Sequence, residues 1–215
     1  MNTNDLRRLT FTTAAAVAIG LLAGCAASTT PQSSPSGTTA PTPNPTPTPT
    51  ETPDADPADP STWIISDEGI GPVALGGDFA DTLAALPDTW TNDDVCSWTA
   101  WWNAPDSSYG MYFVRGTESD TAPISEMSVS SAAEDLGSVD GPRTADGLGV
   151  GATADQVLAA YPDAEQGTAE IGTGTWMRLA SETEGHVFFA FREGEDVASS
   201  VVVTTRSEPS YEVCG

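Results

Sequence analysis

Lysine is absent from this sequence and histidine occurs once, at His186, so positive charge is scarce along all 215 residues. All seven basic residues are arginine, against 31 acidic residues, and the formal net charge is −24. So acidic a chain is repelled by the phosphates of nucleic acids and by anionic lipid head groups. We therefore expect no nucleic-acid binding, and any charged partner should be cationic: a basic protein surface, a polyamine or a metal ion. The alternative is that the acidity only keeps an exported domain soluble.

Motifs for catalysis and for cofactors are also missing. A zinc site needs several Cys or His ligands at close spacing, and a catalytic triad needs a nucleophile motif such as Gly-x-Ser-x-Gly, which does not occur. The glycine-rich residues 69–77 (GIGPVALGG) lack the GxGxxG and Walker spacings. We expect no enzyme, no cofactor and no metal site, with His186 at the start of a strand rather than acting as a catalytic base. Glycoside hydrolysis by a pair of carboxylates remains an alternative, because acidic residues are abundant.

The N-terminus has the pattern of an export signal. Arg7 and Arg8 precede an apolar run, residues 14–23, that is too short to span a bilayer. The run ends in Leu-Ala-Gly-Cys at residues 22–25, which resembles the lipobox of bacterial lipoproteins. That resemblance implies removal of residues 1–24, a diacylglycerol on the Cys25 thiol, and anchoring at the extracytoplasmic face of the cell membrane. An ordinary secretory signal with an incidental cysteine is the alternative, and the two arginines leave twin-arginine export open.

Residues 25–60 form the second segment, and its composition is that of a linker. Proline and threonine alternate through PTPNPTPTPTETP at residues 41–53. Such a segment cannot bury a core, so we expect it to be disordered or extended, reaching about 100 Å at full stretch. It would hold a folded domain away from the membrane. Abundant alanine and threonine without lysine suggest a high-GC Gram-positive, actinobacterial source.

Two cysteines remain if Cys25 carries lipid. In an oxidising, exported setting an even pair is expected to bridge, which predicts a disulfide between Cys96 and Cys214.

The folded part contains an internal similarity. Residues 75–88 (LGGDFADTLAALPD) align without a gap with residues 150–163 (VGATADQVLAAYPD), at an offset of 75 and with 6 of 14 positions identical. Downstream, the same offset pairs Trp101 with Trp176, Gly110 with Gly185 and Phe113 with Phe188. A constant offset favours an internal duplication, with residues 61–140 as the first repeat and 141–215 as the second. Chance similarity between two alanine-rich helices is the alternative.

Each copy predicts a short helix followed by strands. Asp78 and Thr153 are the expected N-caps, Gln156 completes a capping box with Thr153, and Pro87 and Pro162 end the helices. Apolar runs separated by turn residues then predict three strands in each copy: residues 96–102, 110–116 and 124–130, then 174–180, 186–193 and 197–205. Residues 61–67 are a further candidate strand. The expected fold class is α+β, with two tandem repeats in one domain, each a helix on an antiparallel three-strand meander, in one continuous sheet or two packed sheets.

This twofold pattern of GIG, capped helix, AA[LY]PD and meander is similar to the tandem-repeat fold of the beta-lactamase inhibitory proteins. It also resembles the SmpA/OmlA envelope domain. The resemblance implies a non-enzymatic protein that binds another protein through an exposed sheet surface. In the inhibitory proteins each half carries its own disulfide, whereas the bridge expected here joins the halves, so no binding residue is transferred.

Tryptophans are the candidate partner-binding residues. Trp98, Trp101 and Trp102 lie within five residues, and Trp176 matches Trp101 in the second copy. On a strand, Trp98 and Trp102 share one face and Trp101 takes the other. Exposed tryptophans anchor protein or sugar partners, whereas buried ones only fill a core, and both interpretations stay open.

Together these features predict a monomeric, lipid-anchored protein whose duplicated domain binds another envelope protein or a wall polymer without catalysis. Two alternatives are a surface cation-binding protein and a cell-wall hydrolase that uses paired carboxylates.

Overall fold

The computed structural model describes residues 55–92 and 94–214. The predicted signal peptide, Cys25 and most of the predicted linker lie outside the described residues. The described residues belong to one compact unit, Thr50–Gly215. None of its helices within the described residues has the length and apolar character needed to cross a membrane.

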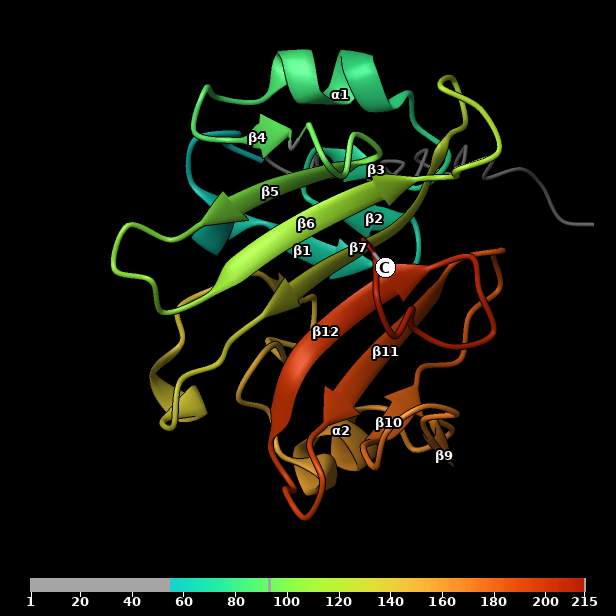
Figure 1. The fold of residues 1–215 in the computed structure, drawn as a ribbon. Coiled ribbons are helices and arrows are strands. Elements are labelled where there is room, and N and C mark those ends of the chain that lie inside the picture. The colour runs from blue at the N-terminus through green and yellow to red at the C-terminus, as the bar shows by residue number, and fades with distance from the viewer. Residues whose placement is uncertain (1–54, 93, 215) are drawn as a thin grey trace, which may run out of the picture. The chain divides into compact units, whose positions relative to one another are not determined.

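An eight-stranded antiparallel sheet, hereafter the main sheet, forms the centre of the fold (Figure 1). Its strand order is β4-β5-β6-β7-β12-β11-β10-β9. Strands β7 and β12, the last of each half, pair in the middle, so the two halves share one continuous sheet. The strands are β4 (Thr91–Asn92), β5 (Thr99–Asn103), β6 (Gly110–Arg115), β7 (Ile124–Ser130), β9 (Glu165–Thr168), β10 (Thr175–Arg178), β11 (His186–Phe191) and β12 (Ala198–Thr204). The six predicted strands are present, and β4 and β9 add one edge strand to each half.

The two helices begin and end as their sequences predict. In α1 (Phe79–Ala85), the Asp78 side chain accepts a hydrogen bond from the backbone N of Asp81. In α2 (Ala154–Ala160), Thr153 and Gln156 form the reciprocal capping box. The residue after each helix is followed by proline, which cannot continue the backbone hydrogen bonding. Both helices have seven residues, too few for stability in isolation, so the sheet beneath must stabilise them.

A second, four-stranded sheet has the order β3-β2-β1-β8. It contains β1 (Ile64–Ser66), β2 (Gly69–Ile70), β3 (Val73–Ala74) and β8 (Arg143–Thr144), with β1 and β8 parallel. The candidate strand in residues 61–67 is therefore real, but it belongs to this separate sheet. Two short 3-10 turns, Pro60–Thr62 and Leu136–Ser138, complete the elements.

The chain makes structural contacts before Ser61, where the domain was expected to begin. The indole Nε1 of Trp63 donates a hydrogen bond of 2.7 Å to the carbonyl of Asp56. Ala55 packs against the core. The end of the Pro/Thr-rich segment is thus part of the folded unit.

One face of the main sheet carries the core. Figure 1 shows α2 and the second sheet behind the main sheet and the C-terminus in front of it. Phe79 of α1 contacts Phe113 with ring centroids 5.1 Å apart, and Val157 of α2 is fully buried. The core also contains a run of successive ring contacts through Trp63, Trp90, Trp102 and Tyr109.

The two halves have the same order of elements, a helix and then four strands. Trp101 and Trp176, paired by the sequence offset, both lie on the sheet face away from the helices. The offset fails further along, because Phe113 faces the core whereas Phe188 lies on the opposite face. The connection between the paired ends of β10 and β11 is three residues longer than that between β5 and β6. Because side chains alternate between the two faces of a strand, an insertion of an odd number of residues moves the residues after it to the opposite face of the sheet. The common order of elements does not test the duplication, which stays a prediction.

Candidate functional site

The side of the main sheet away from the helices, here called the outer face, is defined by the strand register. Residues that pair across antiparallel strands point to the same side. One row across the outer face contains Trp101, Tyr112, Ser128, Val202, Phe188 and Arg178. The neighbouring row contains Gly110, Ser130, Ser200, Ala190 and Trp176. Small side chains therefore form the middle of this face, and an indole stands at one end of each row.

Residues 205–214, the C-terminal segment, cross the outer face and cover part of it (Figure 1). The predicted disulfide between Cys96 and Cys214 is present, with the two Cα atoms 5.6 Å apart. Beside it, the indole Nε1 of Trp98 donates a 2.7 Å hydrogen bond to the carbonyl of Val213. The disulfide and this hydrogen bond hold the chain end against the beginning of β5.

Glu126 fixes the C-terminal segment to the middle of the sheet. This carboxylate is fully buried and accepts hydrogen bonds from the hydroxyl of Tyr112, at 3.0 Å, and from the backbone N and hydroxyl of Ser210, at 3.1 Å each. Burial, together with the neighbouring Glu126 carboxylate, raises the pKa of Tyr112 well above its usual value near 10. The phenol therefore keeps its proton and remains a hydrogen-bond donor at neutral pH.

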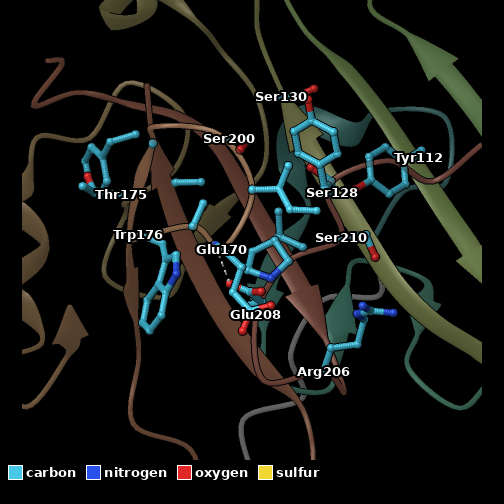
Figure 2. A pocket seen from close by; sticks show the side chains of 18 residues that line it. Tyr112, Ser128, Ser130, Glu170, Thr175, Trp176, Ser200, Arg206, Glu208 and Ser210 are labelled. Carbon is cyan, nitrogen blue, oxygen red and sulfur yellow. Dashed lines mark hydrogen bonds between the residues drawn. The ribbon is translucent and has the colours of Figure 1, made fainter. Parts of the chain in front are cut away.

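A cavity of about 410 Å³ lies between the outer face, the connection from β9 to β10 and the C-terminal segment (Figure 2). This volume lies within the range of small-ligand sites. Its floor includes Ser128, Ser130 and Ser200, and its polar rim includes Glu170, Arg206 and Glu208. Trp176 and Tyr112 stand on opposite sides of it, with Glu170 and Glu208 between them in the view of Figure 2.

The buried indole Nε1 of Trp176, at the cavity, has no hydrogen-bond partner within the described chain. The hydroxyls of Ser130, Ser200 and Thr175 also line the cavity. An indole N–H normally finds an acceptor when it is buried. Among the described residues, no hydrogen bond fixes the Trp176 ring.

The four candidate tryptophans do not form one surface. Trp102 is only 9% exposed and packs in the core against Trp90 and Tyr109, so for this residue the core interpretation is correct. Trp98 precedes β5 and is half-buried beside the C-terminal segment, so it does not share the environment of Trp102.

The other two candidates, Trp101 and Trp176, lie half-buried on the outer face. Trp101 packs against Tyr112 with ring centroids 5.4 Å apart. Trp176 makes an edge contact with Phe188 at 5.3 Å and lines the cavity. The structure thus brings one of the four, Trp176, to the cavity.

His186 lies at the start of β11, where the sequence predicted it. It is half-buried, and its ring makes an edge contact with Phe188 at 6.3 Å. Within residues 55–92 and 94–214, no group of three His, Cys, Asp or Glu side chains is arranged to hold a metal ion.

The residues that surround the cavity were not identified from the sequence, apart from Trp176. Glu126 falls on the polar side of the alternating strand at residues 124–130, where an exposed acid is expected, so its burial could not be predicted from the sequence. The cavity walls come from the C-terminal segment and from the loop before β10, and its floor comes from strands of the main sheet. Neither segment has a periodic pattern that would place its side chains.

No protein-family model and no curated protein matches the chain. Among solved structures, it is similar to an extracellular protein containing a SCP domain from Bacillus anthracis strain Ames, with 14% sequence identity and a TM-score of 0.32. The match covers 60% of this chain and 43% of that one, so it spans less than half the length of that protein.

Proposed function

We propose that this protein is a non-catalytic binding protein, lipid-anchored at the extracytoplasmic face of the membrane, which holds an envelope protein or a wall polymer against the outer face of its main sheet. The observation that carries the proposal is the outer-face cavity, with its serine and threonine hydroxyls and the unpartnered indole Nε1 of Trp176. Hydroxyls and an indole around a concave, partly apolar site are typical of binding sites.

The exposed apolar side chains support the same location. The described residues leave four large hydrophobic side chains exposed: Ile64, Val95, Ile171 and Tyr211. Two of them, Ile171 and Tyr211, line the cavity, with 58% and 64% of their surface exposed. Single exposed apolar residues are common, but two beside one cavity suit a partner that covers them.

The sequence features outside the described residues complete the proposal. Cys25 in its lipobox-like setting would attach the chain to the membrane, and the Pro/Thr-rich residues would separate the domain from it. We further propose that the two halves are copies of one ancestral unit. This is supported by their common order of elements, by the equivalent caps Asp78 and Thr153, and by Trp101 and Trp176 on the same face.

A site-specific crosslinker tests the proposal on the full chain in its native membranes. A photoreactive amino acid at Ile171 should capture a specific envelope protein or wall fragment. Ile64 is the matched control, because it is also an exposed isoleucine, at 47%, but lies on β1 of the second sheet. Equal capture from both positions, or capture from Ile64 alone, would contradict binding at the outer face.

The hydrolase alternative has a specific feature in its favour, since the cavity is lined by Glu170 and Glu208. Retaining and inverting glycosidases both use two carboxylates. If the protein releases soluble fragments from purified cell walls and Glu208→Gln does not, hydrolysis would replace the binding proposal.

The alternative of a surface cation-binding protein is tested by calorimetry with calcium, where the absence of binding heat would remove it.

A further inference from the structure

Most of the positively charged side chains in the described part of the chain form ion pairs or hydrogen bonds within the protein. Of the five arginines in residues 55–214, three form ion pairs: Arg115 with Asp120, Arg178 with Glu165, and Arg192 with Glu195. Arg143 donates instead to backbone carbonyls. Only Arg206, among the arginines of these described residues, has a guanidinium without an ion pair or hydrogen bond. Carboxylates elsewhere therefore have few cations within the protein to neutralise them.

Two such carboxylates stand at the cavity. Neither Glu170 nor Glu208 has an ion pair in the described structure, and one oxygen of Glu208 accepts only a long, 3.4 Å hydrogen bond from the backbone N of Glu170. Figure 2 shows both side chains between Trp176 and Ser210. The field of a chain with net charge −24 adds to theirs, so this end of the cavity favours a cation.

The neighbouring indole is suited to the same kind of ligand. A Cβ added to Gly167 would lie 2.2 Å from the Trp176 ring, so the indole rests directly on the backbone of β9. The indole and the Phe188 ring meet in a T-shaped contact. Tryptophan is the strongest of the aromatic rings in cation–π attraction, and an ammonium group beside an indole and carboxylates gains from both.

We propose that this cavity binds an alkylammonium group, held between the Trp176 indole and the carboxylates of Glu170 and Glu208. The inference rests on the proposed function, and it names the chemistry that the partner must present there. A lysine side chain of an envelope protein and a free polyamine carry the same group. The cavity volume of about 410 Å³ leaves room for the alkyl chain over the serine floor.

Arg206 makes the proposal sharply testable, because it lines the same cavity with the opposite charge. A cationic ligand is repelled by its guanidinium, so Arg206→Gln should tighten binding. For an anionic ligand, each of these charge changes at the cavity would alter the binding affinity in the opposite direction.

Calorimetry on the full chain in neutral detergent measures the effect, with Nα-acetyl-lysine methylamide and spermidine as probes. We expect Glu170→Gln and Glu208→Gln each to weaken binding about fivefold, Trp176→Leu to weaken it by a similar factor, and added salt to weaken it further. Glu182→Gln, an exposed change of the same charge away from the cavity, should leave affinity unchanged. Arg206→Gln should strengthen binding about threefold.

The probes and variants together distinguish the possible ligands. Binding of the lysine probe in preference to spermidine identifies a protein source for the group, and the reverse identifies a free polyamine. Equal binding of the Nε-acetylated lysine probe, or an unchanged affinity in both glutamate variants, overturns the inference. If the crosslinker at Ile171 captures a partner whose binding ignores these charge changes, the proposed function stands and the ammonium site does not. The exposed Glu170→Gln variant keeps the test valid if Trp176→Leu fails to fold.

Discussion

Ser210 donates two hydrogen bonds to one oxygen of Glu126, from its backbone N and from its hydroxyl, each 3.1 Å long. The other oxygen accepts from Tyr112 of β6. Because the carboxylate is fully buried, these donors replace the water that it would otherwise bind. One side chain in the middle of the sheet thereby fixes the segment that forms a wall of the cavity.

Replacing Glu126 should therefore destabilise the protein more than any exposed acid does. Glu126→Ala leaves the donors of Tyr112 and Ser210 without an acceptor, and we expect a loss of about 2–4 kcal/mol in the free energy of unfolding. Glu126→Gln should lose less, because an amide oxygen can still accept. Urea denaturation followed by tryptophan fluorescence measures both, with Glu182→Gln as the control. A loss below about 0.5 kcal/mol in Glu126→Ala would show that the network contributes little.

The disulfide should make a separate contribution. Cys96 and Cys214 are 118 residues apart in sequence, and the chain-entropy model gives about 4–5 kcal/mol for a loop of this length. Cys96→Ser, Cys214→Ser and the double variant should all lose a similar amount, and reduced wild type should match them. A red shift in fluorescence is also expected, because Trp98 loses the restraint that keeps Val213 beside it. Variants as stable as oxidised wild type would contradict the prediction.

Alkaline pH should weaken the fold through Tyr109. Burial, and then the charges of Asp59, Asp140 and Asp106, raise its pKa to about 12, whereas an unfolded tyrosine titrates near 10. Between these values the unfolded chain binds fewer protons than the folded chain, so stability falls as pH rises from about 10 to about 12.

Tyr109→Phe removes this titrating group and should reduce the slope of the stability–pH curve between about pH 10 and 12, while Tyr112, whose pKa is also raised, accounts for part of the slope that remains. Denaturation midpoints at successive pH values measure the slope, and ultraviolet absorbance of the phenolate reports the titration directly. The exposed Tyr211→Phe is the control. If stability falls with pH as steeply in Tyr109→Phe as in wild type, Tyr109 is not the origin of the pH dependence.

Strong local signals explain which parts of the fold were predictable. Asp78 and Thr153 cap their helices by short-range hydrogen bonds, and each helix stops beside a proline, so the sequence alone locates both elements. The six predicted strands each contain several apolar residues between turn residues. The edge strands β4 and β9 were missed because their residues are polar or glycine and mostly exposed, which leaves no apolar pattern to detect.

Long-range polar contacts explain what was not predictable. Residues 205–214 are mostly polar and have no periodicity, and they lie on the outer face because of Cys214, Ser210 and Val213, each with a partner more than 80 residues away. The cavity exists only once this segment is in place. The sequence left a core role and a binding role open for all four tryptophans. The register of the sheet places Trp102 in the core and Trp176 at the cavity.

The membrane anchor is predicted from residues outside the described part. Cys25→Ala removes the thiol that would carry the lipid, so the protein should leave the membrane fraction or accumulate as an unprocessed precursor. Fractionation and intact mass measure both results. Cys25→Ala that remains in membranes with normal processing would contradict the lipobox interpretation.

Gly167 offers a way to disturb the cavity without changing any charge. The Cβ of an alanine there would lie 2.2 Å from the Trp176 ring, so the ring must move, whereas the backbone conformation of β9 accepts alanine. Because Trp176 Nε1 has no partner, the move breaks no hydrogen bond, and we expect a stability loss of only about 1 kcal/mol.

Gly137→Ala is the matched control, because a Cβ there would meet only a side-chain oxygen, at 3.4 Å. Gly147→Ala is unsuitable as a control because the φ of Gly147, 79°, favours glycine. We expect Gly167→Ala to shift the tryptophan emission and to weaken binding of the lysine probe, while Gly137→Ala changes neither. Unchanged binding in a variant whose emission has shifted would separate the indole from ligand recognition and leave the carboxylates as the remaining determinant.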